Sequence, residues 1–281
     1  MSEKKLTFEY CDKLVKEFED VIKRPINKKS STYYCGVDLG TACIVLAVMD
    51  EEYTPVAGAF RYADVVKDGM VVDYIGAVKI VRELKNELEE KLNTELIYAA
   101  AAIPPGTDAL DSGAIKNVVQ AAGFELTNLL DEPTAANEVL HIKNGAVVDI
   151  GGGTTGISIL KDGKVIYVAD EPTGGTHFSL VLSGAYGMTF NEADKFKRNN
   201  EKHKEILPVL KPVVEKVSSI INQHIKGYDV KEISLVGGTC CLTGIEEIIE
   251  KQTGIYTHKP RNPMFVTPLG IALSCTKEIM D

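Results

Sequence analysis

The sequence Val147-Val148-Asp149-Ile150-Gly151-Gly152-Gly153-Thr154-Thr155 decides how the rest of the chain is interpreted. Its apolar residues favour a β-strand, and an aspartate lies near the end of that strand. Three glycines then leave the backbone free to approach an anion, and two threonines add hydroxyl and amide donors. The stretch predicts a strand that ends in a phosphate-binding turn. Taken alone, it fits a plain hairpin between two strands equally well.

A similar phrase, Asp38-Leu39-Gly40-Thr41-Ala42, occurs earlier in the chain. An apolar run precedes it from Tyr33, and a second apolar run follows it at 44–49. Both phrases therefore predict a hairpin with an aspartate at the end of its first strand and glycine and threonine in its turn. Two such hairpins indicate a duplicated architecture, in which each half brings one phosphate-binding loop to a shared cleft.

The composition limits the classes of partner. The chain has 281 residues, enough for two lobes that each bury a core, and 44% of them are hydrophobic. A net charge of -9, with no basic block among the aromatics, argues against nucleic acid and against anionic membranes. Apolar runs fall well short of the roughly 20 residues that cross a bilayer, and no signal peptide is evident. We therefore expect a cytoplasmic protein.

The cysteines predict neither a zinc site nor a disulfide framework, because they form no CxxC pair and have no histidine at ligand spacing. They are Cys11, Cys35, Cys43, Cys240, Cys241 and Cys275. Buried free thiols are the expectation. The adjacent pair Cys240-Cys241 leaves a redox role open, since it follows a glycine-rich turn.

Hydrophobic periodicity predicts the remaining elements. Helices are expected at 7–23, 74–92, 111–122, 191–200, 206–226 and 245–251, and further helices begin at Glu132, Gly174 and Thr267. Strands are expected at 54–62, 96–103, 124–130, 164–169 and 232–236. Pro208 and Pro212 are placed at the beginning of their helix. The glycines before the helix at Gly174 suggest backbone amides that face an anion.

The first helix is amphipathic, because its apolar residues recur on one face and charges lie opposite. The apolar residues are Cys11, Leu14, Val15, Phe18, Val21 and Ile22. Such a face docks on the body of the protein or on a partner, and we favour the body. The polar run 24–31 predicts a linker to the first strand.

Five phrases in this chain resemble the signature of the actin-like ATPase superfamily. The family names them phosphate 1, connect 1, phosphate 2, adenosine and connect 2. Here they read Asp38-Leu-Gly-Thr41, Asp131-Glu-Pro-Thr-Ala-Ala136, Asp149-Ile-Gly-Gly-Gly-Thr154, Val236-Gly-Gly-Thr239 and Thr267-Pro-Leu-Gly-Ile-Ala272. One glycine-rich phrase is a weak signal, whereas five in order across 31–281 form a strong one.

More narrowly, the phrases at 64–69, 72–77 and 80–85 resemble the EutJ family of ethanolamine-utilisation operons. That family is described as chaperone-like and is associated with bacterial microcompartments. The resemblance implies an ATP-binding, chaperone-like ATPase with a protein client, an ethanolamine-degrading enzyme or a shell protein. A non-catalytic, nucleotide-binding adaptor or scaffold is the alternative. Small-molecule kinases and iron-sulfur activators share the superfamily and are minor alternatives.

The resemblance also implies a fold: α/β, a two-lobed actin-like ATPase fold of duplicated ribonuclease-H-like domains, without a peptide-binding domain. Residues 1–30 would form the N-terminal helix and linker. Lobe I would comprise 31–145, completed by about 267–281, and lobe II would comprise 146–266. ATP or ADP and Mg²⁺ would bind in the cleft.

The site residues follow from the same resemblance. Asp38 and Asp149 would hold Mg²⁺ through water, and Glu132 would orient the attacking water, so these three are the catalytic candidates. The nucleotide-binding candidates are Gly40, Thr41, Ala42, Gly151, Gly152, Gly153, Thr154, Asp194, Lys197, Gly237, Gly238 and Thr239.

Three departures from the family pattern bear on the rate of hydrolysis. Ala42 stands where the phosphate 1 turn often has a second threonine, and Cys241 stands where heat-shock chaperones carry an arginine that packs on the base. No lysine at 61–79 matches their catalytic lysine. These departures predict slow hydrolysis, or nucleotide binding without hydrolysis.

Overall fold

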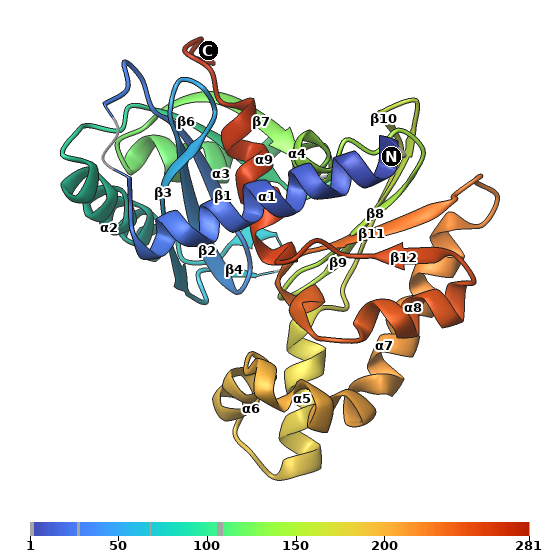
Figure 1. Cartoon of the computed structure of the whole chain (residues 1–281). Helices are drawn as coiled ribbons and strands as arrows, with labels where there is room; N and C mark the ends of the chain where they lie inside the picture. The colour runs from blue at the N-terminus through green and yellow to red at the C-terminus, as the bar shows by residue number, and fades with distance from the viewer. Residues whose placement is uncertain (1–2, 27–28, 68, 106–108, 281) are drawn as a thin grey trace. The chain divides into compact units, whose positions relative to one another are not determined.

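The computed structural model describes residues 3–26, 29–67, 69–105 and 109–280, and the chain divides into two compact units (Figure 1). Unit 1 extends to His141 and resumes at Phe265, and unit 2 is Ile142–Met264. The backbone thus passes between the units at two crossovers, 141–142 and 264–265. Each unit is built around its own five-stranded sheet.

The sheet of unit 1 has the strand order β3-β2-β1-β6-β7. Its strands are β1 (Tyr34–Leu39), β2 (Cys43–Met49), β3 (Pro55–Tyr62), β6 (Tyr98–Ile103) and β7 (Glu125–Asp131). The first three strands pair antiparallel, whereas β1, β6 and β7 run parallel. The carboxyl ends of β1, β6 and β7 therefore meet at one edge.

The sheet of unit 2 repeats this topology in the order β10-β9-β8-β11-β12. Its strands are β8 (Gly145–Ile150), β9 (Thr155–Lys161), β10 (Lys164–Glu171), β11 (Glu232–Val236) and β12 (Tyr256–His258). Again three strands are antiparallel and three are parallel. The predicted duplicated α/β fold is confirmed. Strand β12 was not expected, because three residues are too few to show a period.

Helices complete both units. Unit 1 contains α1 (Glu3–Lys23), α2 (Tyr74–Leu92), α3 (Ala109–Ala121), α4 (Glu132–Leu140) and α9 (Val266–Ser274), with a small hairpin of β4 (Val66–Lys67) and β5 (Met70–Val71). Unit 2 contains α5 (Gly175–Tyr186), α6 (Phe190–Lys197), α7 (His203–Ile225) and α8 (Ile245–Thr253). Among the described residues, no helix combines the length and apolarity needed to span a bilayer.

Helix α7 corrects one expectation. Because α7 begins at His203, Pro212 lies in its third turn, and both prolines are inside the helix. The early start has a local cause: the ring of His203 contacts Thr243 Oγ1 through Nδ1 and Lys197 O through Nε2, each at 3.0 Å. These contacts fix the first residue of α7 between two other segments of unit 2.

Helix α1 docks on its own chain, as favoured from its pattern, and lies across β3, α4 and α9 (Figure 1). Its predicted apolar face is buried, with Phe18 fully enclosed, except for Ile22, which is partly exposed. A Cβ on Gly58 of β3 would lie 2.4 Å from the Phe18 ring, so the absent side chain makes room for that ring. The Phe18 ring also meets the Phe265 ring edge to face, with 5.2 Å between centroids.

The two connect helices, α4 and α9, cross at very short range. A Cβ on Gly270 of α9 would lie 1.7 Å from the carbonyl oxygen of Ala135 in α4. A Cβ on Gly36 of β1 would lie 2.5 Å from Pro268 O of α9. Helix α9 is therefore packed between β1 and α4 with no space for additional atoms.

We predict that Gly270→Ala destabilises the protein by about 3 kcal/mol, because its methyl group would collide with rigid backbone. Gly184→Ala in α5 is the control. Nothing lies within 4 Å of a Cβ at this position, so the free energy of unfolding should stay within about 0.5 kcal/mol of the wild-type value or rise slightly. Urea unfolding measures both. Equal stabilities for the two variants would contradict the described packing.

Candidate functional site

The acidic residues of unit 1 lie along one edge of its sheet. Val37 pairs with Ala101, and Ile103 pairs with Asp131, so Asp38 and Glu132 both occur where parallel strands end. Strands β1 and β7 are two positions apart, which places the two backbones about 10 Å from each other. The predicted phosphate 1 and connect 1 residues are therefore at the same edge.

The start of α4 is fixed by a side-chain cap. The carboxylate of Asp131 accepts from Thr134 N at 2.9 Å and from Thr134 Oγ1 at 2.7 Å. Pro133 occupies the first turn, where its missing N–H costs no helical hydrogen bond. Glu132 is thus held at a defined strand-to-helix junction and is partly exposed.

The turn between β1 and β2 contains the three predicted residues Gly40, Thr41 and Ala42. A Cβ on Gly40 would lie 2.9 Å from Cys43 O, so the turn is tight. Ala42 is exposed, and its carbonyl accepts from Ala63 N at 3.3 Å.

In unit 2, the turn after β8 is closed by Gly151 N, which donates to Thr154 O at 3.0 Å. The carbonyl of Gly151 accepts from Thr239 Oγ1 at 2.8 Å and from Gly175 N at 2.9 Å. Val236 pairs with Asp149, which brings 237–239 level with the turn. The phosphate 2 and adenosine phrases, far apart in sequence, are therefore in direct contact.

Gly237 is required by the position of Asp149. Its φ is +90°, and a Cβ there would lie 2.1 Å from Asp149 Oδ1. A side chain would therefore be strained by the backbone and would displace the carboxylate. The glycine of the adenosine phrase thus makes room for the aspartate of the hairpin.

The turn itself presents backbone donors. Within the described residues, no backbone carbonyl accepts a hydrogen bond from the backbone N–H of Gly152, Gly153 or Thr154. Gly174 packs against this turn so closely that a Cβ would lie 2.7 Å from Gly153 C. Three successive amides without backbone acceptors match the donor set that a phosphate needs.

The helix start at Gly174 differs from the expectation. The N–H groups of Gly175 and Thr176 donate to Gly151 O at 2.9 Å and Gly152 O at 2.8 Å. The N-terminal amides of α5 therefore support the glycine turn rather than face an anion. The first amides of a helix have no acceptor within the helix, and here the turn carbonyls take the place that an anion would otherwise fill.

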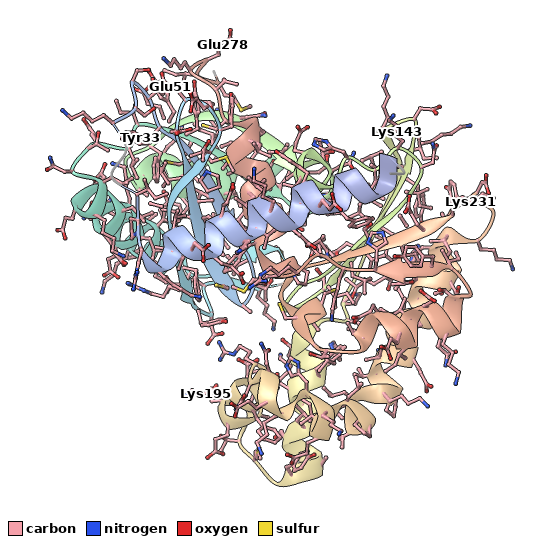
Figure 2. The ribbon with its side chains drawn as sticks, in the orientation of Figure 1. Tyr33, Glu51, Lys143, Lys195, Lys231 and Glu278 are labelled. Atoms are coloured by element: carbon pink, nitrogen blue, oxygen red, sulfur yellow. The ribbon has the colours of Figure 1, made fainter. Side chains whose placement is uncertain are left out.

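Asp194 and Lys197 lie beside the same turn. Lys197 Nζ is 2.9 Å from Asp194 Oδ1 and donates to Gly175 O and Ser179 Oγ, each at 2.8 Å. The Lys197 ammonium is mostly buried, whereas Lys195, two residues earlier, is exposed (Figure 2). These contacts fasten the end of α6 to the start of α5. The sequence did not reveal Ser179 or Gly175, because their proximity arises only on folding.

The carboxylate of Asp194 has a lowered pKa. Burial acts to raise that pKa, but the nearby Lys197 and Arg198 cations and the hydrogen bond from Ser179 outweigh it. Arg198 Nη2 lies 2.7 Å from Asp194 Oδ2, and Arg198 is the C-cap of α6, one helical turn after Asp194. The i,i+4 spacing was a signal in the sequence that could have identified Arg198 as a partner.

Four of the six cysteines are buried, as expected. Cys43 and Cys241 are partly exposed, and they follow the phosphate 1 turn and the adenosine phrase. Cys241 Sγ lies 3.4 Å from Asn262 Oδ1. Cys240 is fully buried, and burial raises the pKa of its thiol, which disfavours a redox role for the adjacent pair.

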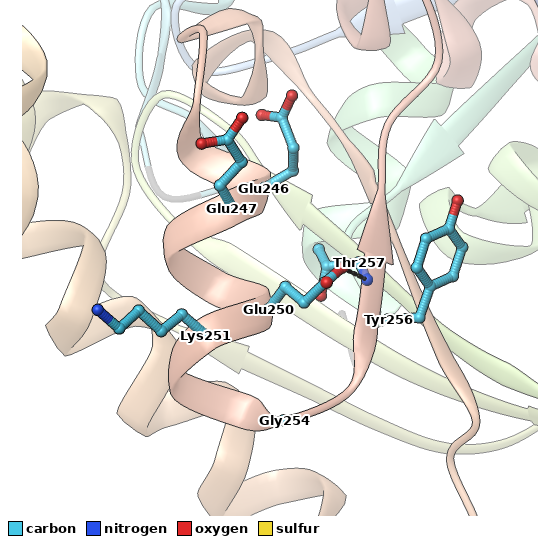
Figure 3. A pocket seen from close by; sticks show the side chains of 7 residues that line it. All are labelled: Glu246, Glu247, Glu250, Lys251, Gly254, Tyr256 and Thr257. Carbon is cyan, nitrogen blue, oxygen red and sulfur yellow. Dashed lines mark hydrogen bonds between the residues drawn. The ribbon is translucent and has the colours of Figure 1, made fainter.

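A separate hollow of about 510 Å³ lies between α8 and β12 in unit 2 (Figure 3). Its lining consists of Glu246, Glu247, Glu250, Lys251, Gly254, Tyr256 and Thr257. Glu250 Oε2 accepts from Thr257 N at 2.9 Å. None of the predicted nucleotide residues lines this hollow, and its acidic surface is unsuited to a phosphate.

Two topologically equivalent α/β units, each with an aspartate-bearing hairpin and a glycine-threonine turn, define an actin-like ATPase fold. Family models agree: that of the MreB/Mbl protein matches residues 56–182, and that of the type IV pilus assembly protein PilM matches 133–264. Crystal structures of MreB5 of Spiroplasma citri bound to ADP and to AMPPNP share the fold, with TM-scores of 0.67 and 0.66 at 16% and 17% identity. They cover 85% and 86% of this chain, and 95% of each is covered in return.

The chain is 45% identical over 245 residues to the ethanolamine utilization protein EutJ of Escherichia coli strain K12, covering 87% of this chain and 86% of that protein. The crystal structure of EutJ from Carboxydothermus hydrogenoformans matches with a TM-score of 0.90 and 49% identity, covering 95% of this chain and 98% of that one. The chain belongs to the EutJ family.

We predict that Asp194→Asn lowers the free energy of unfolding by about 2 kcal/mol at pH 7, because it leaves the buried Lys197 without a charged partner. The lowered pKa means that Asp194 stabilises the fold above its unfolded pKa and stops doing so as the pH falls through the folded pKa. The difference from the wild type should therefore shrink below about pH 4.

Asp229→Asn provides the matched control, since the Asp229–Lys231 ion pair is exposed and should contribute little. Denaturant unfolding at several pH values gives the free energy of unfolding of the wild type and of both variants. A difference for Asp194→Asn that does not change with pH would contradict the assigned ionisation.

Proposed function

We propose that this protein binds ATP and Mg²⁺, hydrolyses ATP slowly, and serves ethanolamine utilisation as a chaperone-like factor. Its client would be a microcompartment enzyme or shell protein, in the cytoplasm and without nucleic acid or membrane as partner. Membership of the EutJ family supports the role in ethanolamine utilisation, and the actin-like fold supports the binding of a nucleotide. The observation that carries the proposal is the Gly151–Thr154 turn. Within the described residues, no backbone carbonyl accepts from the N–H groups of 152–154, and the carbonyls of 151 and 152 accept hydrogen bonds from Thr239 and from the start of α5.

The phosphate-binding role falls to the two hairpin turns. Gly152, Gly153 and Thr154 would donate backbone N–H groups to phosphate oxygens, as amides in such concave turns do. Gly40 and Thr41 would do the same from unit 1. Ala42 offers an amide but no hydroxyl, which removes one contact that the family pattern often includes.

Asp38 and Asp149 fit a hydrated Mg²⁺, because each is a partly exposed carboxylate at the end of the first strand of a hairpin. When bound, the ion would supply charge neutralisation for the phosphates. The protein's contribution is to hold the carboxylates still. For Asp149, the contact with Gly237 limits the positions that its carboxylate can take.

Glu132 would accept a hydrogen bond from the water that attacks the terminal phosphate. This role needs a fixed acceptor more than an unusual pKa. The Asp131 cap and Pro133 hold the start of α4, so the Glu132 backbone does not move freely.

Gly237, Gly238 and Thr239 would line the adenosine pocket. Asp194 and Lys197 would position it, because Lys197 holds Gly175 O, and Gly175 in turn contacts Gly151. Cys241 would replace the arginine that packs on the base in heat-shock chaperones, which favours weaker binding of the nucleotide.

A non-catalytic adaptor is the second candidate, and Ala42 and Cys241 are the observations that favour it. In that case nucleotide would fix the shape of the protein without being turned over. Measured ATP turnover separates the two candidates, since retained ATP affinity with no hydrolysis selects the adaptor.

We predict that Glu132→Ala lowers kcat for ATP hydrolysis at least 100-fold, because the attacking water loses its acceptor. ATP affinity, measured by calorimetry, should stay within about threefold, because Glu132 has no assigned phosphate contact. Glu138→Ala, at an exposed position of the same helix, should leave both quantities unchanged. Unchanged hydrolysis in Glu132→Ala would remove the assigned role.

We also predict nucleotide-dependent association with a client. In cells that grow on ethanolamine, affinity capture with ATP and with ADP should recover one ethanolamine-degrading enzyme or shell protein in unequal amounts, since a nucleotide-driven factor changes client affinity between states. Quantitative mass spectrometry measures the ratio. Recovery of the same amount in both states would contradict the chaperone-like cycle and favour the adaptor.

A further inference from the structure

Helix α1 makes aromatic contacts with the residues that border both crossovers. The ring of Tyr10 lies 5.5 Å from the ring of His141, the last residue of unit 1 before the first crossover. The ring of Phe18 lies 5.2 Å from that of Phe265, the first residue of unit 1 after the second crossover. One helix therefore contacts the two places where the backbone passes between units.

The contact between Phe18 and Phe265 is closely packed. Phe18 is fully buried, and the Gly58 position is open only because that residue has no side chain. The Phe60 ring, from the same strand as Gly58, lies 5.9 Å from the Phe265 ring. Three phenylalanine rings from α1, β3 and the second crossover thus form one cluster.

The rest of α1 is firmly seated. Cys11, Leu14, Val15 and Val21 are buried, and burial raises the pKa of the Cys11 thiol to about 12, so this thiol stays uncharged in the interface. After the helix, Ile26 N donates to Val56 O of β3 at 2.8 Å. This hydrogen bond and the close approach of Phe18 to Gly58 tie the C-terminal half of α1 to β3.

The contact between Tyr10 and His141 is more exposed to solvent. Tyr10 is 41% exposed, and His141 is exposed and has a left-handed backbone, with φ of 51°, as the C-cap of α4. This end of α1 can therefore separate from its neighbour at a lower cost than the Phe18 end.

We propose that α1 is a strap that restrains both crossovers, so that loosening of α1 frees the backbone at 141–142 and at 264–265. Each unit carries part of the proposed nucleotide-binding residues, and the crossovers are the backbone links between them. A factor that loosens α1 would thereby change nucleotide turnover. This last consequence rests on the proposed function, whereas the restraint on the crossovers does not.

Hydrogen exchange of the full chain without nucleotide tests the restraint, with Tyr10→Ala and Phe18→Leu as separate variants. Tyr10→Ala should speed exchange at the amides of Ile142 and Lys143 about tenfold, and Phe18→Leu should do so at Met264 and Phe265. Amides in β6 and β11 should keep the wild-type rate. Lys16→Ala, on the exposed face of α1, is the control and should change nothing.

Faster exchange within α1 alone, with both crossovers unchanged, would overturn the strap. A uniform increase in the exchange rate that includes the amides of β6 and β11 would overturn it as well. Tyr10→Ala should keep the fold, because the Tyr10 side chain is partly exposed. ATP turnover of the same variants forms a second arm. If the wild type hydrolyses ATP and the variants match it, the regulatory consequence is wrong while the proposed function stands. If the wild type binds no nucleotide, the proposed function fails and the exchange result still decides the restraint.

Discussion

The carbonyl oxygen of Gly151 is the point on which the arrangement of unit 2 depends. It accepts from Gly175 N and from Thr239 Oγ1, so a hairpin turn, a helix start and the segment after β11 converge on one atom. Within the described residues, the amides of 152–154 that follow this carbonyl have no backbone acceptor. Lys197 extends the same network by holding Gly175 from the other side. One carbonyl thus holds the turn, the start of α5 and the segment after β11 together.

Unit 1 positions its acidic residues by close packing instead. Gly36 and Gly270 allow β1, α9 and α4 to approach until backbone atoms touch, and the start of α4 is capped by Asp131. Rigid contacts of this kind leave few alternative positions for the strand end and the helix start. The two units thus share a sheet topology but fix their functional residues by different interactions, one through a branched hydrogen-bond network and the other through glycine-mediated contact.

Much of the architecture was predictable from the chain, and the reasons differ by element. The repeated aspartate, glycine and threonine order indicated the duplication, and the apolar period of α2 located that helix from Tyr74 to Leu92. Strand β12 was missed because three residues show no period. The amides of Gly175 and Thr176 were misjudged because their acceptors, Gly151 and Gly152, are more than 20 residues away. The surroundings of Lys197 were likewise invisible, since Ser179 and Gly175 come from another helix. The residue types in the motifs identified the candidate site residues. Their hydrogen-bond partners could not be predicted, because folding brings them together from distant parts of the sequence.

The equal strand order of the two sheets allows positions to be compared between them. After β11, the chain continues with Gly237, whose missing side chain leaves room for the Asp149 carboxylate. After the corresponding strand β6, the chain continues with Pro104, whose ring fills the space beside Gly69. The two sheets therefore carry different residues at equivalent positions: a glycine that makes room for a carboxylate in unit 2, and a proline packed against another glycine in unit 1. The two halves are therefore not interchangeable, because exchanging Gly237 for the proline of the other sheet would place a ring where the Asp149 carboxylate lies.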